Sequence, residues 1–83
     1  MRYMKRQPCT IASEMLYAAV EGVRKTHFIS SCNLSYKVCE KYVAILLRDG
    51  LLEKKEDQFY TTEKGVQFIK TCQKLEHLWS IGT

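Results

Sequence analysis

The chain has 83 residues, of which 46% are hydrophobic, with a mean hydropathy of -0.27 and a formal net charge of +4. This length allows one small domain, near the lower limit at which a single hydrophobic core suffices. The composition excludes a disordered chain, and no apolar run approaches the roughly 18 residues of a membrane-spanning helix.

The N-terminal segment is basic, because Arg2, Lys5 and Arg6 fall within the first six residues. A secretory leader also starts with cations, but a proline and polar residues interrupt the apolar stretch that a leader needs. We therefore expect a cytoplasmic protein. Residues 1–9 are expected to form either a solvated terminus or an arm that contacts phosphate, and the basic charge favours an anionic partner.

Four cysteines occur, at positions 9, 32, 39 and 72. None belongs to a C-x-x-C pair, and their spacings match no zinc ribbon or finger. We expect free, structural thiols in a reducing cytosol, although intracellular proteins of hyperthermophiles do keep internal disulfides. A metal or thiol site built from His27, Cys32 and Cys39 is the alternative. The five-residue step from His27 to Cys32 disfavours it, because the two do not share one helix face.

The first half of the chain predicts two helices. Thr10 is a suitable N-cap for a first helix, whose apolar pattern ends near Gly22. A short connector over residues 24–26 then leads into a second, shorter helix over about residues 26–32.

A turn and a third helix follow. Asn33 tolerates the left-handed conformation that a tight turn requires. Ser35 is an N-cap for a helix that continues to about Asp49, and Gly50 is suited to end it.

The last third of the chain predicts a hairpin and a final helix. Residues 51–55 and 58–61 have the composition of two short strands. Thr62 is an N-cap for a last helix that ends near Ser80. The expected fold is mostly α with a small β-hairpin (α+β), in the order helix, helix, helix, hairpin, helix.

The third helix is amphipathic when its residues are placed about 100° apart. One side is apolar and is formed by Cys39, Tyr42, Val43 and Leu46, with Leu47 at its margin. The opposite side is formed by Lys37, Lys41 and Arg48, with Ala44 between them. This pattern fits a helix that packs inward and presents cations outward, but an ordinary solvated helix face shows it too.

The spacing around Asn33 favours a helix-turn-helix. That motif requires apolar residues at five positions, which here are Phe28, Cys32, Leu34, Cys39 and Tyr42. A small buried thiol behaves as a hydrophobic residue, so both cysteines suit inward positions. Ile29 occupies a position where a small residue is usual, which predicts a somewhat altered crossing of the two helices.

Three short motifs extend this interpretation: N-L-S-Y at residues 33–36, G-L-L at 50–52 and T-E-K-G at 62–65. With these motifs, residues 10–75 resemble the small winged helix-turn-helix proteins common in archaea and their viruses. The resemblance implies a winged helix-turn-helix domain over residues 10–65 and a dimerisation helix over 62–80.

The resemblance also implies binding to double-stranded DNA, with the third helix in the major groove and the hairpin as wing. The residues implied to face DNA are Ser35, Tyr36, Lys37, Glu40 and Lys41 on the third helix, with Lys54 and Lys55 on the wing. Arg48 joins them from the basic side of the helix, and Arg2, Lys5 and Arg6 from the arm. The acidic residues Glu53, Glu56 and Asp57 weaken the case for strong wing binding.

The last helix carries apolar residues at steps of four, three and four, the spacing of a coiled-coil seam. They are Phe68, Cys72, Leu75 and Trp79. A second strip of Val66, Ile69 and Leu78 adjoins it. We expect a homodimer through this helix, with a disulfide between the two Cys72 residues as one possibility. The alternative is that the seam folds back on the first helix.

Three functions fit the sequence. The first is a DNA-binding transcriptional regulator or nucleoid-associated protein that acts as a homodimer. The second is a winged-helix module that binds protein, and the third is the thiol or metal sensor described above. We expect no enzyme and no cofactor, because the chain offers no nucleophile–base pair and no cofactor-binding loop.

Overall fold

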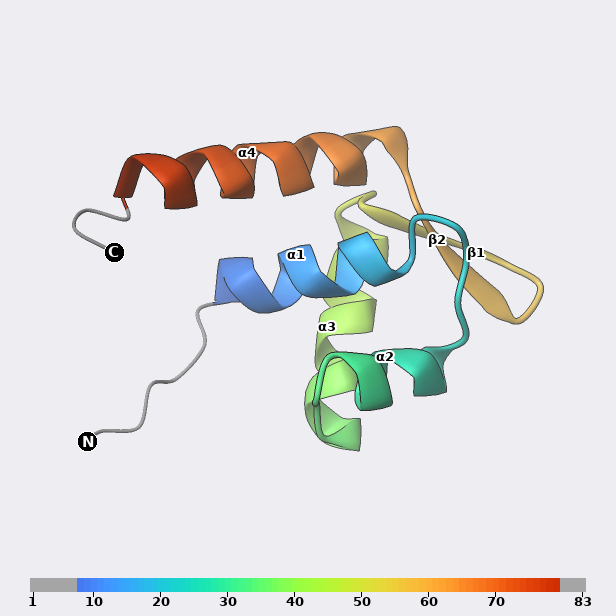
Figure 1. The fold of residues 1–83 in the computed structure, drawn as a ribbon. Helices are drawn as coiled ribbons and strands as arrows, with labels where there is room; N and C mark the ends of the chain where they lie inside the picture. Colours follow the sequence, from blue (N-terminus) through green and yellow to red (C-terminus); the bar gives the residue numbers. More distant parts are fainter. Residues whose placement is uncertain (1–7, 80–83) are drawn as a thin grey trace, which may run out of the picture.

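Figure 1 shows the fold as a computed structural model, which describes residues 8–79 and the side chains of residues 8–75. The elements are α1 (Pro8–Ala18), α2 (Lys25–Ser31), α3 (Tyr36–Arg48), β1 (Leu52–Lys55), β2 (Gln58–Thr61) and α4 (Glu63–Trp79). This order confirms the predicted α+β class. The arm residues Arg2, Lys5 and Arg6 lie outside the described residues.

The first helix starts and ends earlier than predicted. α1 begins at Pro8, so Thr10 lies within the first turn of the helix and is not its N-cap. Proline suits the first helical position, because its missing N–H needs no partner there and its φ is already helical. After Ala18 the chain turns through residues 19–21, and Gly22 has a positive φ of 96°. Gly22 therefore closes the turn that follows the helix.

The segment from α2 to α3 agrees with the predicted helix-turn-helix. Asn33 has a φ of 56°, in the left-handed region that the turn requires. The Ser35 hydroxyl caps α3 by accepting a hydrogen bond from the Val38 N–H at 3.2 Å. Gly50 has a φ of 76° and follows the C-cap residue Asp49. In Figure 1, α3 runs crosswise to α1.

The hairpin is held to the helices by a pairing that the sequence did not predict. β1 and β2 are antiparallel, with Lys54 opposite Phe59. Val23, in the connector after α1, pairs with Phe59 through two backbone hydrogen bonds of 3.0 and 2.7 Å. The connector therefore covers the outer edge of β2 and fixes the wing relative to α2.

The start of α4 is fixed to the end of α3. The Thr62 hydroxyl caps α4 by accepting from the Gly65 N–H at 3.1 Å, as predicted, and it donates to the Gly50 carbonyl at 2.7 Å. Gly65 is buried, and a side chain there would overlap the Leu51 carbonyl. This close approach explains why glycine occupies the first turn of α4.

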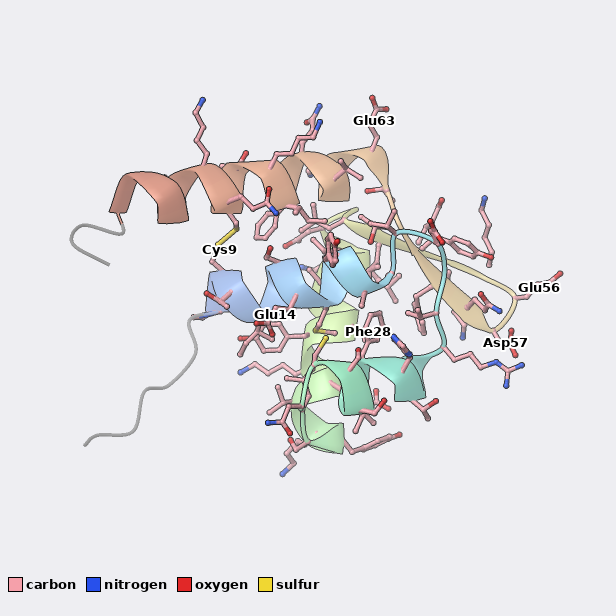
Figure 2. All side chains as sticks on the ribbon, viewed as in Figure 1. Cys9, Glu14, Phe28, Glu56, Asp57 and Glu63 are labelled. Atoms are coloured by element: carbon pink, nitrogen blue, oxygen red, sulfur yellow. A yellow bond between two sulfur atoms is a disulfide. The ribbon has the colours of Figure 1, made fainter. Side chains whose placement is uncertain are left out.

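A disulfide joins Cys9 on α1 to Cys72 on α4 (Figure 2). The Cα atoms of these two cysteines are 6.8 Å apart. The expectation of free thiols is therefore wrong for both residues, and the bond also replaces the suggested disulfide between two Cys72 residues. The reason is tertiary: α1 and α4 pack side by side and bring together positions 63 residues apart. Cys32 and Cys39 are buried thiols outside the disulfide, as predicted.

The core confirms the helix-turn-helix register. The positions expected to point inward are Phe28, Cys32, Leu34, Cys39 and Tyr42. The first four are buried, and Tyr42 is half-buried against them. The other buried residues of the core are Ala12, Met15, Leu16, Ala19, Val43, Leu46, Leu51, Leu52, Phe59 and Ile69. Ile29 fits as a half-buried residue at the edge of this core.

Candidate nucleic-acid interface

α3 presents a basic outer side above a buried inner side. Its buried residues are Cys39, Val43 and Leu46. The outer side carries Lys37, Lys41 and Arg48, all exposed, and we call these three residues the basic stripe. The apolar side contacts the core, so the stripe faces away from the protein and is accessible to an anionic partner.

The three cations of the basic stripe are not equivalent. Arg48 Nε donates to the neighbouring Asp49 carboxylate at 3.0 Å, and this hydrogen bond raises the pKa of Arg48. Both side chains are largely exposed, so water screens the pair. Within residues 8–75, Lys37 and Lys41 have no carboxylate at ion-pair distance. The two lysines therefore present more uncompensated positive charge than Arg48 does.

The N-terminal end of α3 presents two polar residues. Ser35 is exposed, although its hydroxyl also caps the helix. Tyr36, the first helical residue, is 63% exposed. In a helix-turn-helix the first residues of the second helix are the ones that reach base edges. Both predicted residues are thus placed where such contact is possible.

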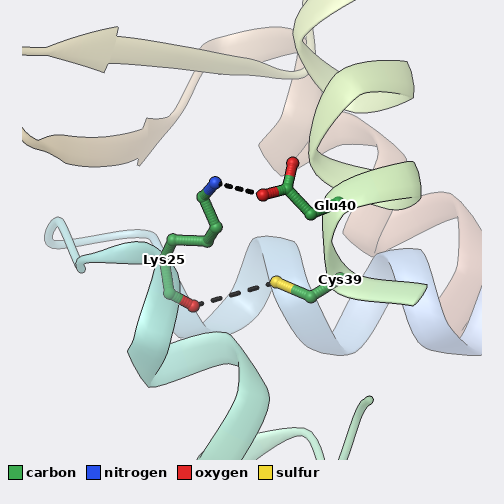
Figure 3. Close-up of polar contacts among 3 residues, drawn as sticks. All are labelled: Lys25, Cys39 and Glu40. Atoms are coloured by element: carbon green, nitrogen blue, oxygen red, sulfur yellow. Dashed lines mark hydrogen bonds and ion pairs between the residues drawn. The ribbon is translucent and has the colours of Figure 1, made fainter. Parts of the chain in front are cut away.

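Glu40, also predicted to face DNA, is engaged within the chain. Its carboxylate accepts a hydrogen bond from the Lys25 ammonium at 2.7 Å (Figure 3). The hydrogen bond from Lys25 holds the pKa of Glu40 below its usual value, and the nearby Tyr36 side chain lowers it further. The Lys25 ammonium also lies 5.7 Å from the centre of the Tyr36 ring. These three residues form one polar cluster that links α2 to the first turns of α3.

The buried thiols of the helix-turn-helix do not form a metal site with His27. His27 is exposed, whereas Cys32 and Cys39 lie in the core. Burial raises the pKa of the Cys39 thiol, which keeps it protonated and unreactive. No cluster of three or more histidine, cysteine, aspartate or glutamate residues suited to a metal occurs among the described residues.

The wing carries its cations beside acidic groups. The ammonium of Lys55 lies 3.9 Å from the Glu53 carboxylate and 5.7 Å from the centre of the Tyr60 ring. Lys54 lies at the same distance from the Phe59 ring, and no carboxylate within the described part of the chain pairs with it.

The tip of the hairpin is acidic. Arg24, at the start of α2, pairs with Asp57 there at 3.3 Å. Glu56 precedes Asp57 and has a φ of 59°. Figure 2 shows both acidic residues at the far end of the wing. The wing therefore offers Lys54 as its least compensated cation.

The predicted seam of α4 is partly used within the chain. Cys72 is buried by its bond to Cys9, and Phe68 is half-buried against the core. Leu75 is 57% exposed, and the side chain of Trp79 lies outside the described part. No described helix is both long enough and apolar enough to cross a membrane.

Sequence reasoning missed two cations, one that pairs with α3 and one that pairs with the wing. Arg24 is the N-cap of α2 and Lys25 its first residue, and both pair with residues that are distant in sequence. Their basic character was visible, but their position beside α3 and the wing depends on how α2 crosses α3. A helix-turn-helix register could have indicated Lys25, because the start of the first motif helix lies near the second.

Comparison with known proteins agrees with this geometry. A family model described as winged helix-turn-helix matches residues 5–80. An uncharacterized protein of Methanocaldococcus jannaschii is 28% identical over 75 residues, which make up 89% of this chain and 77% of that protein. The match spans all six described elements, from α1 to α4. The chain belongs to the winged helix-turn-helix family.

Proposed function

We propose that the protein binds double-stranded DNA and regulates transcription, with α3 in the major groove. The observation that carries this proposal is the orientation of α3. Its inner side is buried in the core, whereas Lys37 and Lys41 are exposed on the outer side without a carboxylate partner in the described part of the chain. A helix in this position of the motif fits the width of the major groove.

The proposed contacts divide into two kinds. Lys37, Lys41 and Arg48, with Lys54 and Lys55 of the wing and Arg2, Lys5 and Arg6 of the arm, supply phosphate contacts. Such contacts give most of the affinity and make it sensitive to salt. Ser35 and Tyr36, at the exposed end of α3, reach base edges, which carry the sequence information. The protein acts by binding alone, without catalysis or a cofactor.

Charge reversal on α3 tests the proposal. We expect Lys37→Glu with Lys41→Glu to reduce affinity for a 20-base-pair duplex by on the order of 100-fold or more at low salt, because two phosphate contacts become repulsions. Fluorescence anisotropy measures this. The matched control is Lys70→Glu with Lys74→Glu, since these lysines are exposed on α4 and carry the same charge. Equal losses in both variants would mean that net charge, and not α3, governs binding.

We further propose a homodimer through the last helix, which places one α3 in each half of a DNA site. The exposed apolar Leu75 supports this proposal. Leu75 and Trp79 form the contact, whereas Cys72 is buried by its bond to Cys9 and Phe68 is half-buried against the core, so these two seam residues pack within the chain. Light scattering coupled to size exclusion tests it: Leu75→Asp should convert the dimer to a monomer. A wild-type chain that is monomeric at tens of micromolar contradicts the dimer.

A second function, binding to protein through the wing, is favoured by the acidic hairpin. Glu53, Glu56 and Asp57 are all exposed and surround the wing lysines. The paired substitutions at Lys37 and Lys41 separate the two functions. If the protein binds DNA through α3, these substitutions should abolish DNA binding. If it binds a protein through the wing, they should leave capture of that partner intact.

We propose a cytoplasmic, nucleoid-associated location for a DNA regulator. Fluorescence of a tagged copy should then overlap the DNA.

A further inference from the structure

Lys25 is fixed to α3 by two contacts. The proposed function described above gives Lys25 no role. The Cys39 thiol donates to the Lys25 carbonyl at 3.8 Å, and the Lys25 ammonium binds Glu40 at 2.7 Å (Figure 3). Both partners are neighbouring residues of α3. The backbone and the side chain of Lys25 are therefore both held beside α3, so this cation accompanies the helix into any interface that α3 forms.

The Lys25–Glu40 pair borders the basic stripe. Glu40 follows Lys37 by three residues, which puts it about 60° away around the helix axis. The side chains of Lys25 and Glu40 are 34% and 43% exposed, so the pair is open to a large ligand. A DNA backbone that contacts Lys37 would thus meet both a cation and a carboxylate at the edge of the stripe.

We infer that Lys25 is a further phosphate-contacting residue, that Glu40 occupies its ammonium in the free protein, and that Glu40 thereby limits affinity for DNA of any sequence. This inference rests on the proposed function. A phosphate oxygen and the Glu40 carboxylate compete for the same ammonium, because both are acceptors of its charge-assisted hydrogen bonds. A phosphate must displace Glu40 to gain the contact.

The consequence of this competition is a lower affinity for every duplex. The penalty from Glu40 is the same for all sequences, since phosphates carry no sequence information. It therefore leaves the ratio of affinities between sequences to the base contacts. The Lys25 ammonium also lies 5.7 Å from the centre of the Tyr36 ring, so the pair adjoins that exposed side chain.

A double-mutant cycle on a 20-base-pair duplex of random sequence tests the inference. Glu40→Gln removes the charge and keeps the shape, and Lys25→Met removes the ammonium and keeps the apolar stem. We expect Glu40→Gln to tighten binding by about 3- to 10-fold at low salt and to steepen the slope of log Kobs against log salt by about one, the value for one added phosphate contact. In the Lys25→Met background, the same substitution should change affinity by less than about twofold.

Two controls accompany the cycle. Glu63→Gln removes an exposed carboxylate at the start of α4 (Figure 2), which contacts the C-terminal end of α3 and not the first turns that carry Glu40, and should leave affinity within about twofold of the wild type. Circular dichroism of each variant establishes that the helices are retained. Both exchanged side chains are partly exposed, so we expect the helices to form in each variant.

Each outcome decides the inference. Unchanged affinity in Glu40→Gln overturns it. An equal gain with and without Lys25 also overturns it, because Glu40 would then act by repulsion of DNA alone. A wild-type protein that binds no duplex refutes the proposed function itself, whereas wild-type binding with no response to Glu40→Gln refutes only the role of the pair.

Discussion

Breaking the bond between Cys9 and Cys72 should lower the free energy of unfolding by about 4 kcal/mol, the value that the chain-entropy model gives for a closed loop of this length. The bonded positions are 63 residues apart, so the cross-link strongly restricts the unfolded chain. Cys9→Ser is the suitable change, because Cys9 is exposed whereas Cys72 is 3% exposed. A serine at position 9 therefore buries no new hydroxyl. The whole free energy of unfolding of a small domain is roughly 5–15 kcal/mol, so this loss is large.

Urea unfolding followed by circular dichroism measures the effect. With a slope of about 1–1.5 kcal/mol per molar for a domain of this size, the midpoint should fall by about 3 M in Cys9→Ser and in the reduced wild type. Melting should occur on the order of 20 °C lower. Adding reductant to Cys9→Ser is the control and should change nothing, because its remaining cysteines form no bond.

Thiol titration under denaturing conditions supplies an independent readout. Protein purified without reductant should show two reactive thiols, those of Cys32 and Cys39, and reduction should expose the other two. Four reactive thiols before reduction would refute the bond. An oxidised and a reduced wild type with the same urea midpoint would refute the energetic reasoning, even with the bond present.

Three further experiments test the packing and electrostatics. Phe28→Ala empties a fully buried site and should lower the free energy of unfolding, measured in urea, by about 3–5 kcal/mol. A decrease below about 1 kcal/mol contradicts the burial of Phe28 in the core. Gly50→Ala, at a φ of 76° in open space, should cost only about 1 kcal/mol, whereas Gly65→Ala should cost more because it meets a backbone carbonyl. Hydrogen bonding to Lys25 lowers the pKa of Glu40, so its contribution to stability is present above pH about 4.5 and is lost as the pH falls through the folded-state pKa. The stability difference between the wild type and Glu40→Gln should therefore shrink as the pH is lowered below about 4.5, and a constant difference contradicts the pairing.

The helix-turn-helix was predictable because its signals are local. Asn33, Ser35 and Gly50 each act through their own backbone conformation or a hydrogen bond three residues away. The periodic apolar residues of α3 add a pattern that only one register satisfies. The predicted start of α1 was wrong because two local signals compete there. The proline at position 8 suits the first helical position, and it prevails over the threonine at position 10 as an N-cap.

The contacts that were missed all depend on tertiary packing. The Cys9–Cys72 bond requires α1 and α4 to lie side by side, and no cysteine spacing reports this. The Lys25–Glu40 pair spans 15 positions and depends on the crossing of α2 and α3. The periodic residues of α4 predicted an apolar stripe, but periodicity does not say what covers it, and at Cys72 the cover is α1.

The salt dependence of wild-type binding to a 20-base-pair duplex tests the central proposal most directly. Five exposed cations lie on α3 and the wing, namely Lys37, Lys41, Arg48, Lys54 and Lys55. If roughly three to five of them contact phosphate in each protomer, log Kobs should fall linearly with log salt at a slope of about -3 to -5 per protomer. Micromolar protein that binds no duplex at low salt, or binding that salt does not weaken, would contradict DNA recognition by this helix.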